Sequence, residues 1–141
     1  MFTKKYTARS LLGTLLVLLL LSGCSAKAPV YAPDDATRQT WLASRGWQIS
    51  PTPVESLRLQ LPSPLDEAWM AYADAQAAQG LPLSNFAGRM VERITYRVEA
   101  PPQGWANAQV NLFLCGDQII GGDVYVPGPD GFQTALTCPK P

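Results

Sequence analysis

Cysteine is the residue type whose position says most about the chemistry of this chain. Cys24 follows the small residues Ser22 and Gly23, which in turn follow the leucine-rich apolar run 11–21. Three basic residues precede that run: Lys4, Lys5 and Arg9. A basic, then apolar, then small-residue order is typical of a secretory signal. The sequence therefore predicts export, with residues 1–23 as a signal peptide.

The tetrad Leu21-Ser22-Gly23-Cys24 resembles the lipobox of bacterial lipoproteins. That resemblance implies cleavage before Cys24, a diacylglycerol on its thiol, and a fatty acid such as palmitate on its new amino group. More than one acyl chain holds a protein lastingly at a membrane. We therefore expect a lipid anchor on the extracytoplasmic face of the cell membrane, or in the outer membrane of a bacterium that has one. An uncleaved membrane anchor is the alternative, although a spanning helix needs about 20 apolar residues.

Two further cysteines, Cys115 and Cys138, remain after Cys24 is used for the anchor. Two cysteines in an oxidising compartment predict a disulfide bond. In the chain-entropy model, closing that loop stabilises the folded state by about 3 kcal/mol. Two separate free thiols are the alternative, since exported domains can keep thiols.

Three arginines, Arg58, Arg93 and Arg97, lie on the polar faces of two predicted strands. If these strands are neighbours, the arginines form a cationic stripe on an open sheet face. A guanidinium binds carboxylate or phosphate through two parallel hydrogen bonds, so the stripe is a possible site for an anionic ligand or an acidic peptide. A solvated charge ladder with Glu55 and Glu99 is the alternative.

Other kinds of chemistry have little support in the composition. The chain has no histidine, which removes histidine-activated nucleophiles and most zinc sites. An enzyme would have to use carboxylates, as glycan hydrolases do, and the available acids are Glu55, Asp66, Glu67, Glu92 and Glu99. A divalent cation could be held only if the loops bring three aspartates together: Asp117, Asp123 and Asp130. Their spacing matches no compact calcium loop, so we expect solvated turn aspartates, local backbone contacts for Asp123, and no metal or cofactor.

Charge and length limit the partners and the number of domains. Without residues 1–23 the chain keeps eight basic and eleven acidic residues, a net charge of −3. This balance lacks the basic surface of nucleic-acid-binding proteins. The remaining length suits one domain with a modest core. We expect a tether over residues 24–34 and a single domain over residues 35–141.

Two helices are expected, each followed directly by a glycine that can end it. The first covers residues 36–45 and is capped by Asp34 or Asp35. The second covers residues 64–79, with Ser63 as its N-cap and a proline at its first position. One stripe of the second helix carries its larger side chains: Leu65, Trp69, Tyr72 and Gln76.

Apolar and polar residues alternate in several segments and predict strands over residues 47–50, 54–61, 89–99, 108–115 and 118–126. A two-residue turn at Gly116-Asp117 connects the last two strands. Within that hairpin, Leu114 should face Ile119 and Phe113 should face Ile120. We expect an α+β fold in which both helices pack on one face of a mainly antiparallel sheet of four to five strands. That face would carry the leucines 57, 59 and 61 and the apolar residues 90, 94, 96 and 98.

Several short segments between Arg38 and Leu136 also carry a family resemblance. They are Trp41-Leu42, Arg45-Gly46-Trp47, Gln79-Gly80, Ile119-Ile120-Gly121-Gly122-Asp123 and Asp130-Gly131-Phe132. In these segments the chain resembles the domain of unknown function 4830 family, a small domain of bacterial lipoproteins. The resemblance implies an extracytoplasmic location and a small fold, and it brings no known activity or catalytic residue.

Together these observations predict a lipid-anchored, non-catalytic binding or accessory module of the cell envelope. Its expected partners are the membrane, through Cys24, and an envelope protein or an anionic ligand. A small carboxylate-dependent enzyme acting on glycan and a purely structural envelope protein are the alternatives.

Overall fold

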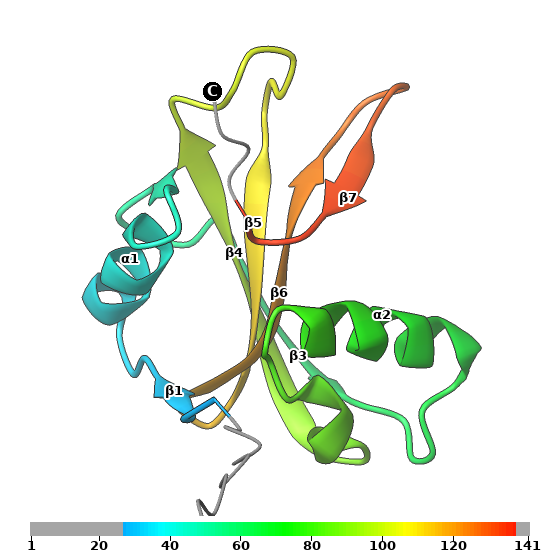
Figure 1. Cartoon of the computed structure of the whole chain (residues 1–141). Helices are drawn as coiled ribbons and strands as arrows, with labels where there is room; N and C mark the ends of the chain where they lie inside the picture. Colours follow the sequence, from blue (N-terminus) through cyan, green and yellow to red (C-terminus); the bar gives the residue numbers. More distant parts are fainter. Residues whose placement is uncertain (1–26, 138–141) are drawn as a thin grey trace, which may run out of the picture.

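Residues 27–137, the part of the chain that the computed structural model describes, form a mainly antiparallel sheet and two helices (Figure 1). The strands are β1 (Val30–Tyr31), β2 (Gln48–Ile49), β3 (Glu55–Gln60), β4 (Met90–Glu99), β5 (Gln109–Cys115), β6 (Gln118–Val126) and β7 (Phe132–Thr134). The helices are α1 (Asp35–Ala43) and α2 (Glu67–Ala78), and a short 3-10 helix, η1 (Leu83–Phe86), follows α2. The predicted α+β class is confirmed.

The three long strands β4, β5 and β6 form the middle of the sheet. Strand β4 pairs with β5 on one side and with both β2 and β3 on the other. Strand β6 pairs with β5 and, on its outer side, with both β1 and β7. All pairs are antiparallel, and short strands therefore make up both borders of a strongly curled sheet (Figure 1).

The two helices lie on opposite faces of the sheet, so the prediction of both on one face is wrong (Figure 1). Leu42 of α1 belongs to a buried cluster with Tyr96 and Leu112. Ala73 of α2 belongs to a second cluster with Val91 and Phe113. Neighbouring residues of one strand point to opposite faces. Because β5 carries apolar side chains in both directions, each face needs a cover.

The side chains of β3 also project from different faces of the sheet than predicted. Leu57 pairs with Arg93 and Leu59 pairs with Val91, whereas Arg58 pairs with Glu92. Directly paired residues share a face of the sheet. The leucines of β3 therefore face α2, and they do not share the face of Ile94, which packs in the α1 cluster.

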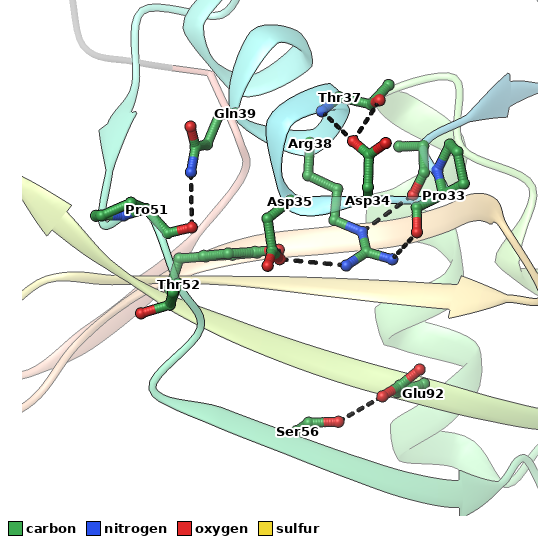
Figure 2. Close-up of polar contacts among 12 residues, drawn as sticks. Pro33, Asp34, Asp35, Thr37, Arg38, Gln39, Pro51, Thr52, Ser56 and Glu92 are labelled. Atoms are coloured by element: carbon green, nitrogen blue, oxygen red, sulfur yellow. Dashed lines mark hydrogen bonds and ion pairs between the residues drawn. The ribbon is translucent and has the colours of Figure 1, made fainter.

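Both helices begin at an aspartate cap. Asp34 accepts a hydrogen bond from the backbone N–H of Thr37 at 2.7 Å, as one of the two predicted caps of α1 (Figure 2). The hydrogen bonds from Thr37 lower the pKa of the Asp34 carboxyl. Asp66 accepts from the N–H of Trp69 at 2.9 Å and caps α2. The predicted N-cap at Ser63 is wrong. The helix begins three residues later, where the Asp66 carboxylate satisfies one of the free N–H groups of its first turn.

The segment predicted as a tether joins the fold at its end. Val30 pairs with Ile119, and the N–H of Ala32 donates to the carbonyl of Asp117 at 2.8 Å. Ala32 is fully buried. Within residues 27–137, no helix has the length and apolar character needed to cross a membrane.

The β5–β6 hairpin turns at Gly116-Asp117 as predicted, and Leu114 pairs with Ile119. Phe113 pairs with Gly121 and not with Ile120, because the register shifts at a bulge between Phe113 and Leu114. Gly122 lies where a Cβ atom would be only 2.8 Å from the carbonyl oxygen of Asn111. This close approach explains why the strand has no side chain there.

Candidate functional site

Helix α2 presents one stripe of side chains to the sheet, as its spacing predicts. Trp69 and Tyr72 are half-buried against Phe113 of β5, and Gln76 is fully buried one turn further on. Residues three or four positions apart lie on the same face of a helix. The stripe therefore forms one wall of the hollows that lie between α2 and the sheet.

Two neighbouring hollows lie between α2 and the strands β5, β6 and β7, with volumes of about 240 and 300 Å³. They share Tyr72, Asp123 and Gln133, and we call the pair the α2 groove. The first hollow is also lined by Ala68, Trp69, Arg93, Asn111 and Phe113, and the second by Ala75, Gln76, Gln79, Thr134 and Ala135. Ligand sites are often concave, largely apolar and fitted with a few placed polar groups.

A chain of hydrogen bonds crosses the groove from the sheet to the helix. The Thr95 hydroxyl donates to Asn111 Oδ1 at 2.7 Å, and Asn111 Nδ2 donates to Asp123 Oδ1 at 2.9 Å. The Tyr72 hydroxyl donates to Asp123 Oδ2 at 2.5 Å. Only 3% of Asp123 is exposed, so its carboxylate depends on these donors. The four residues therefore hold one another in fixed orientations.

Burial and the neighbouring Asp123 carboxylate together raise the pKa of the Tyr72 hydroxyl well above its usual value. Tyr72 thus keeps its proton at ordinary pH and acts as a hydrogen-bond donor. This fixes the direction of the bond to Asp123.

Three aromatic rings form the apolar wall of the groove. Trp69 meets Tyr72 and Phe113 edge to face, with ring centroids 5.8 and 5.9 Å apart. Tyr72 meets Phe113 at 5.5 Å. Such edge-to-face pairs stabilise packing by about 0.5–1.5 kcal/mol beyond burial alone. Trp69 and Tyr72 keep part of their surface exposed, which leaves aromatic surface for a ligand.

Arg93 is the cationic group of the groove. One guanidinium nitrogen, Nη2, lies 3.2 Å from Glu55 Oε1, in an ion pair. The Nε atom is buried and has no hydrogen-bond partner, and in the described part of the chain no other buried side-chain nitrogen or oxygen is left in this state. Arg93 therefore keeps one donor that no other described residue uses.

Two glutamines fix the rear of the groove. Gln76 Oε1 accepts from the N–H of Gly122 at 2.8 Å, and Gln79 Nε2 donates to the carbonyl of Gly122 at 3.2 Å. Gln79 Oε1 also accepts from the N–H of Leu136 at 2.7 Å. These bonds join α2, β6 and the segment after β7, so the groove rests on a rigid frame.

The predicted arginine stripe is divided by the sheet. Arg93 and Arg97 project from the face that α2 covers, but only Arg93 lines the groove. Arg58 pairs with Glu92 and projects from the opposite face. The predicted three-arginine stripe is therefore wrong, because Arg58 projects from the opposite face of the sheet to Arg93 and Arg97.

The predicted catalytic acids are dispersed in the same way. Glu55 pairs with Arg93, Asp66 caps α2, and Glu92 accepts from the Ser56 hydroxyl (Figure 2). Glu67 lies in the first turn of α2, and Glu99 ends β4. None of the five lines the α2 groove.

Asp123 is the carboxylate of the groove, a role that its sequence context does not predict. The sequence predicts contacts with local backbone, but Asp123 bonds side chains of α2 and β5. The available signal was a charged residue within an otherwise apolar strand, since buried carboxylates need partners.

Two of the three cysteines, Cys24 and Cys138, lie outside the described residues. Lipidation of Cys24 and the Cys115–Cys138 bond therefore stay predictions. Cys115 is half-buried at the end of β5, and its Sγ lies 3.7 Å from the carbonyl oxygen of Met90. Its thiol packs against the α2 cluster, whereas Leu136 lies in the α1 cluster.

Across residues 27–137, no three Cys, Asp or Glu side chains gather in a way that could hold a metal ion. Compared with known proteins, the chain matches no family model, no curated protein and no solved structure. The resemblance to the domain of unknown function 4830 family thus stays a hypothesis.

Proposed function

We propose that this protein is a lipid-anchored, extracytoplasmic binding module of the cell envelope, which holds a sugar unit of an envelope glycan in the α2 groove without catalysis. The signal-like N-terminus and the tetrad ending at Cys24 support the location. The groove supports the binding role.

The observation that carries the proposal is an aromatic wall beside a row of fixed polar groups. Trp69 and Tyr72 offer ring surface, and Asn111 and Asp123 are held in place by mutual hydrogen bonds. A pyranose ring has an apolar C–H surface and a rim of hydroxyl groups. It therefore complements a site that is apolar on one side and polar on the other.

The same groove favours binding over hydrolysis. Glycosidases use two carboxyl groups on either side of the scissile bond. Among the described residues that line the groove, Asp123 is the one carboxylate, and both of its oxygens already accept hydrogen bonds. The described lining of the groove therefore lacks the second acid that hydrolysis of a glycosidic bond needs.

An anionic ligand is the second candidate, on the strength of Arg93. Its side chain lines the groove and is 31% exposed, so a carboxylate or phosphate oxygen could accept from the exposed part of the guanidinium. Glu55 already occupies Nη2, so such a ligand would compete with an existing ion pair.

The proposal is tested by titrating the purified mature lipoprotein, in detergent, with soluble oligosaccharides of N-acetylglucosamine and with muropeptides. We expect quenching of tryptophan fluorescence and a binding isotherm. Trp69→Ala should raise Kd at least ten-fold, a loss of about 1.4 kcal/mol. Trp41→Ala is the matched control, because Trp41 stacks on Arg45 of the α1 side. Its Kd should equal that of the wild type.

A second set of variants separates the two ligand classes. Arg93→Gln should abolish binding that weakens steeply with salt, as expected for an anion, whereas Asn111→Ala should weaken binding of a neutral sugar. Equal affinities of wild type and Trp69→Ala for every glycan that binds would contradict the role of the groove. Binding of muropeptides alone, lost in Arg93→Gln, would favour the anionic ligand.

A further inference from the structure

The outer edge of β3 carries backbone groups that the described part of the chain leaves unpaired. Leu61, which follows β3, donates its N–H to the carbonyl of Arg89 at 2.9 Å. In an antiparallel ladder, alternate residues point their backbone N–H and C=O groups to the same neighbour. Leu57 and Leu59 therefore bond to β4, and Ser56, Arg58 and Gln60 point their N–H and C=O groups away from it.

This edge lacks most of the features that prevent strands from associating. Its central residue, Leu57, is 45% exposed, and Val54 beside the strand is 46% exposed. No strand within residues 27–137 pairs with the outer side of β3. Natural proteins usually protect such an edge with lysine, proline, a bulge or a covering segment. Here the prolines 51, 53 and 62 lie outside the strand and leave its six residues open.

We propose that β3 is a dimerisation edge, on which a second copy of this chain pairs its own β3 in antiparallel orientation to continue the sheet. The inference does not rest on the proposed function of the α2 groove, which adjoins this edge only through Arg93, the cross-strand neighbour of Leu57 and ion-pair partner of Glu55. A second copy is the expected partner, because the outward N–H and C=O groups of this edge complement those of an identical strand in antiparallel orientation.

Symmetry limits the possible registers. A two-fold axis perpendicular to the sheet keeps each residue on its own face, so opposite residues must both be odd or both be even. Centring the axis on Leu57 places this leucine opposite its copy and places Ser56 opposite Arg58 of the second copy. Centring it on Arg58 would place two like charges face to face, which is destabilising. Centring it on Ser56 would place Arg58 opposite Val54, whose N–H already donates to the carbonyl of Thr95 in β4 and cannot bond the second copy.

The register centred on Leu57 fits both the backbone and the charges. The unpaired backbone groups of Ser56 and Arg58 meet their counterparts twice, which gives roughly four new hydrogen bonds. Arg58 and Glu92 are direct cross-strand neighbours, but neither forms an ion pair among the described residues. Arg58 of one copy would approach Ser56 of the other, whose hydroxyl donates to Glu92 (Figure 2). The second copy thus places a second arginine beside the Ser56–Glu92 pair.

The experiment is disulfide crosslinking of the full-length lipoprotein in intact cells under mild oxidation. Leu57→Cys should yield a covalent dimer, since opposite side chains at a non-hydrogen-bonded pair lie closest together. Met70→Cys is the matched control, because Met70 is similarly exposed, at 51%, but lies on α2. It should crosslink at least ten-fold less. The unsubstituted chain reports any background from the native cysteines.

The register is tested by co-expressing Glu55→Cys with Leu59→Cys, positions that lie opposite each other in the proposed pairing. The two variants should crosslink when mixed and not when expressed alone. Arg58→Pro removes an outward N–H and should abolish the Leu57→Cys dimer, while the single chain tolerates a proline on an edge strand. Leu57→Lys in the mature protein, measured by sedimentation in detergent, should convert a dimer mass into a monomer mass. A wild-type monomer, together with equal crosslinking of Leu57→Cys and Met70→Cys, would overturn the proposal.

Discussion

At the residue scale, the defining feature is a buried carboxylate that is held by neutral hydrogen-bond donors. Asp123 is held by the Tyr72 hydroxyl and by the Asn111 amide. Burying a charge is costly unless hydrogen bonds replace the lost water, so these donors stabilise the folded state. They also keep Asp123 in a fixed orientation toward the groove.

Because of Tyr72, the free energy of unfolding changes with pH in the alkaline range. Burial and the charge of Asp123 raise its pKa above the ordinary value of 10.0, and burial raises the pKa of Tyr96 to about 12. The unfolded chain loses these protons near pH 10 while the folded chain retains them. The stabilisation is therefore complete below pH 10 and declines above it. For Tyr72 the slope is about 1.4 kcal/mol per pH unit.

Urea unfolding followed by circular dichroism between pH 8 and 12 measures this effect. Tyr72→Phe should lower the free energy of unfolding at pH 8 by about 1–3 kcal/mol, because Asp123 loses a donor. The variant should also show a shallower decline above pH 10. An identical slope in the variant and the wild type would contradict the assignment to Tyr72.

At the scale of elements, helix α2 depends on where it begins and on what ties it to the sheet. Asp66 supplies the cap, and Gln76 and Gln79 connect the last turns to Gly122. The stripe that carries Trp69 and Tyr72 is positioned between these two attachments. A change in the first turn of the helix should therefore affect both stability and the groove.

Replacing Asp66 and Ser63 separately distinguishes the observed helix start from the predicted one. Asp66→Ala should lower the free energy of unfolding by about 1 kcal/mol, the usual effect of losing an N-cap. Ser63→Ala is the matched control and should change it by less than about 0.5 kcal/mol. Chemical denaturation of both variants provides the measurement, and a larger loss in Ser63→Ala would contradict the cap at Asp66.

At the scale of the whole molecule, the chain begins its described fold close to the predicted anchor. Val30 already pairs with Ile119, only six residues after Cys24. A lipid on Cys24 would therefore hold the sheet near the membrane surface. Two-dimensional confinement there would raise the local concentration of neighbouring copies, which favours weak pairing along an edge such as β3.

Lipidation is tested directly by labelling cells with radioactive palmitate. Wild-type protein should incorporate label and run as the processed form. Cys24→Ala should lose the label and accumulate as the precursor, while Cys115→Ala should be labelled normally. Undiminished labelling of Cys24→Ala would show that the anchor lies elsewhere.

The sequence alone determined the features that depend on neighbouring residues. Alternation located β3 to β6, the helical spacing put Trp69 and Tyr72 on one stripe, and Gly116-Asp117 marked the hairpin turn. The glycines after both helices have positive φ values, 91° at Gly46 and 76° at Gly80, as expected for helix ends. These features follow from backbone geometry over a few residues, which the order of amino acids fixes directly.

The tertiary structure decided which faces and which distant segments meet. Alternation shows that Leu57 and Arg58 point in opposite directions, but only the pairing with β4 shows that Leu57 shares a face with Arg93. The same pairing separates Arg58 from Arg93. Likewise, Asp123 gains its role from Tyr72, 51 residues earlier in the chain. Register and packing depend on the burial of both sheet faces at once, and no local pattern contains that information.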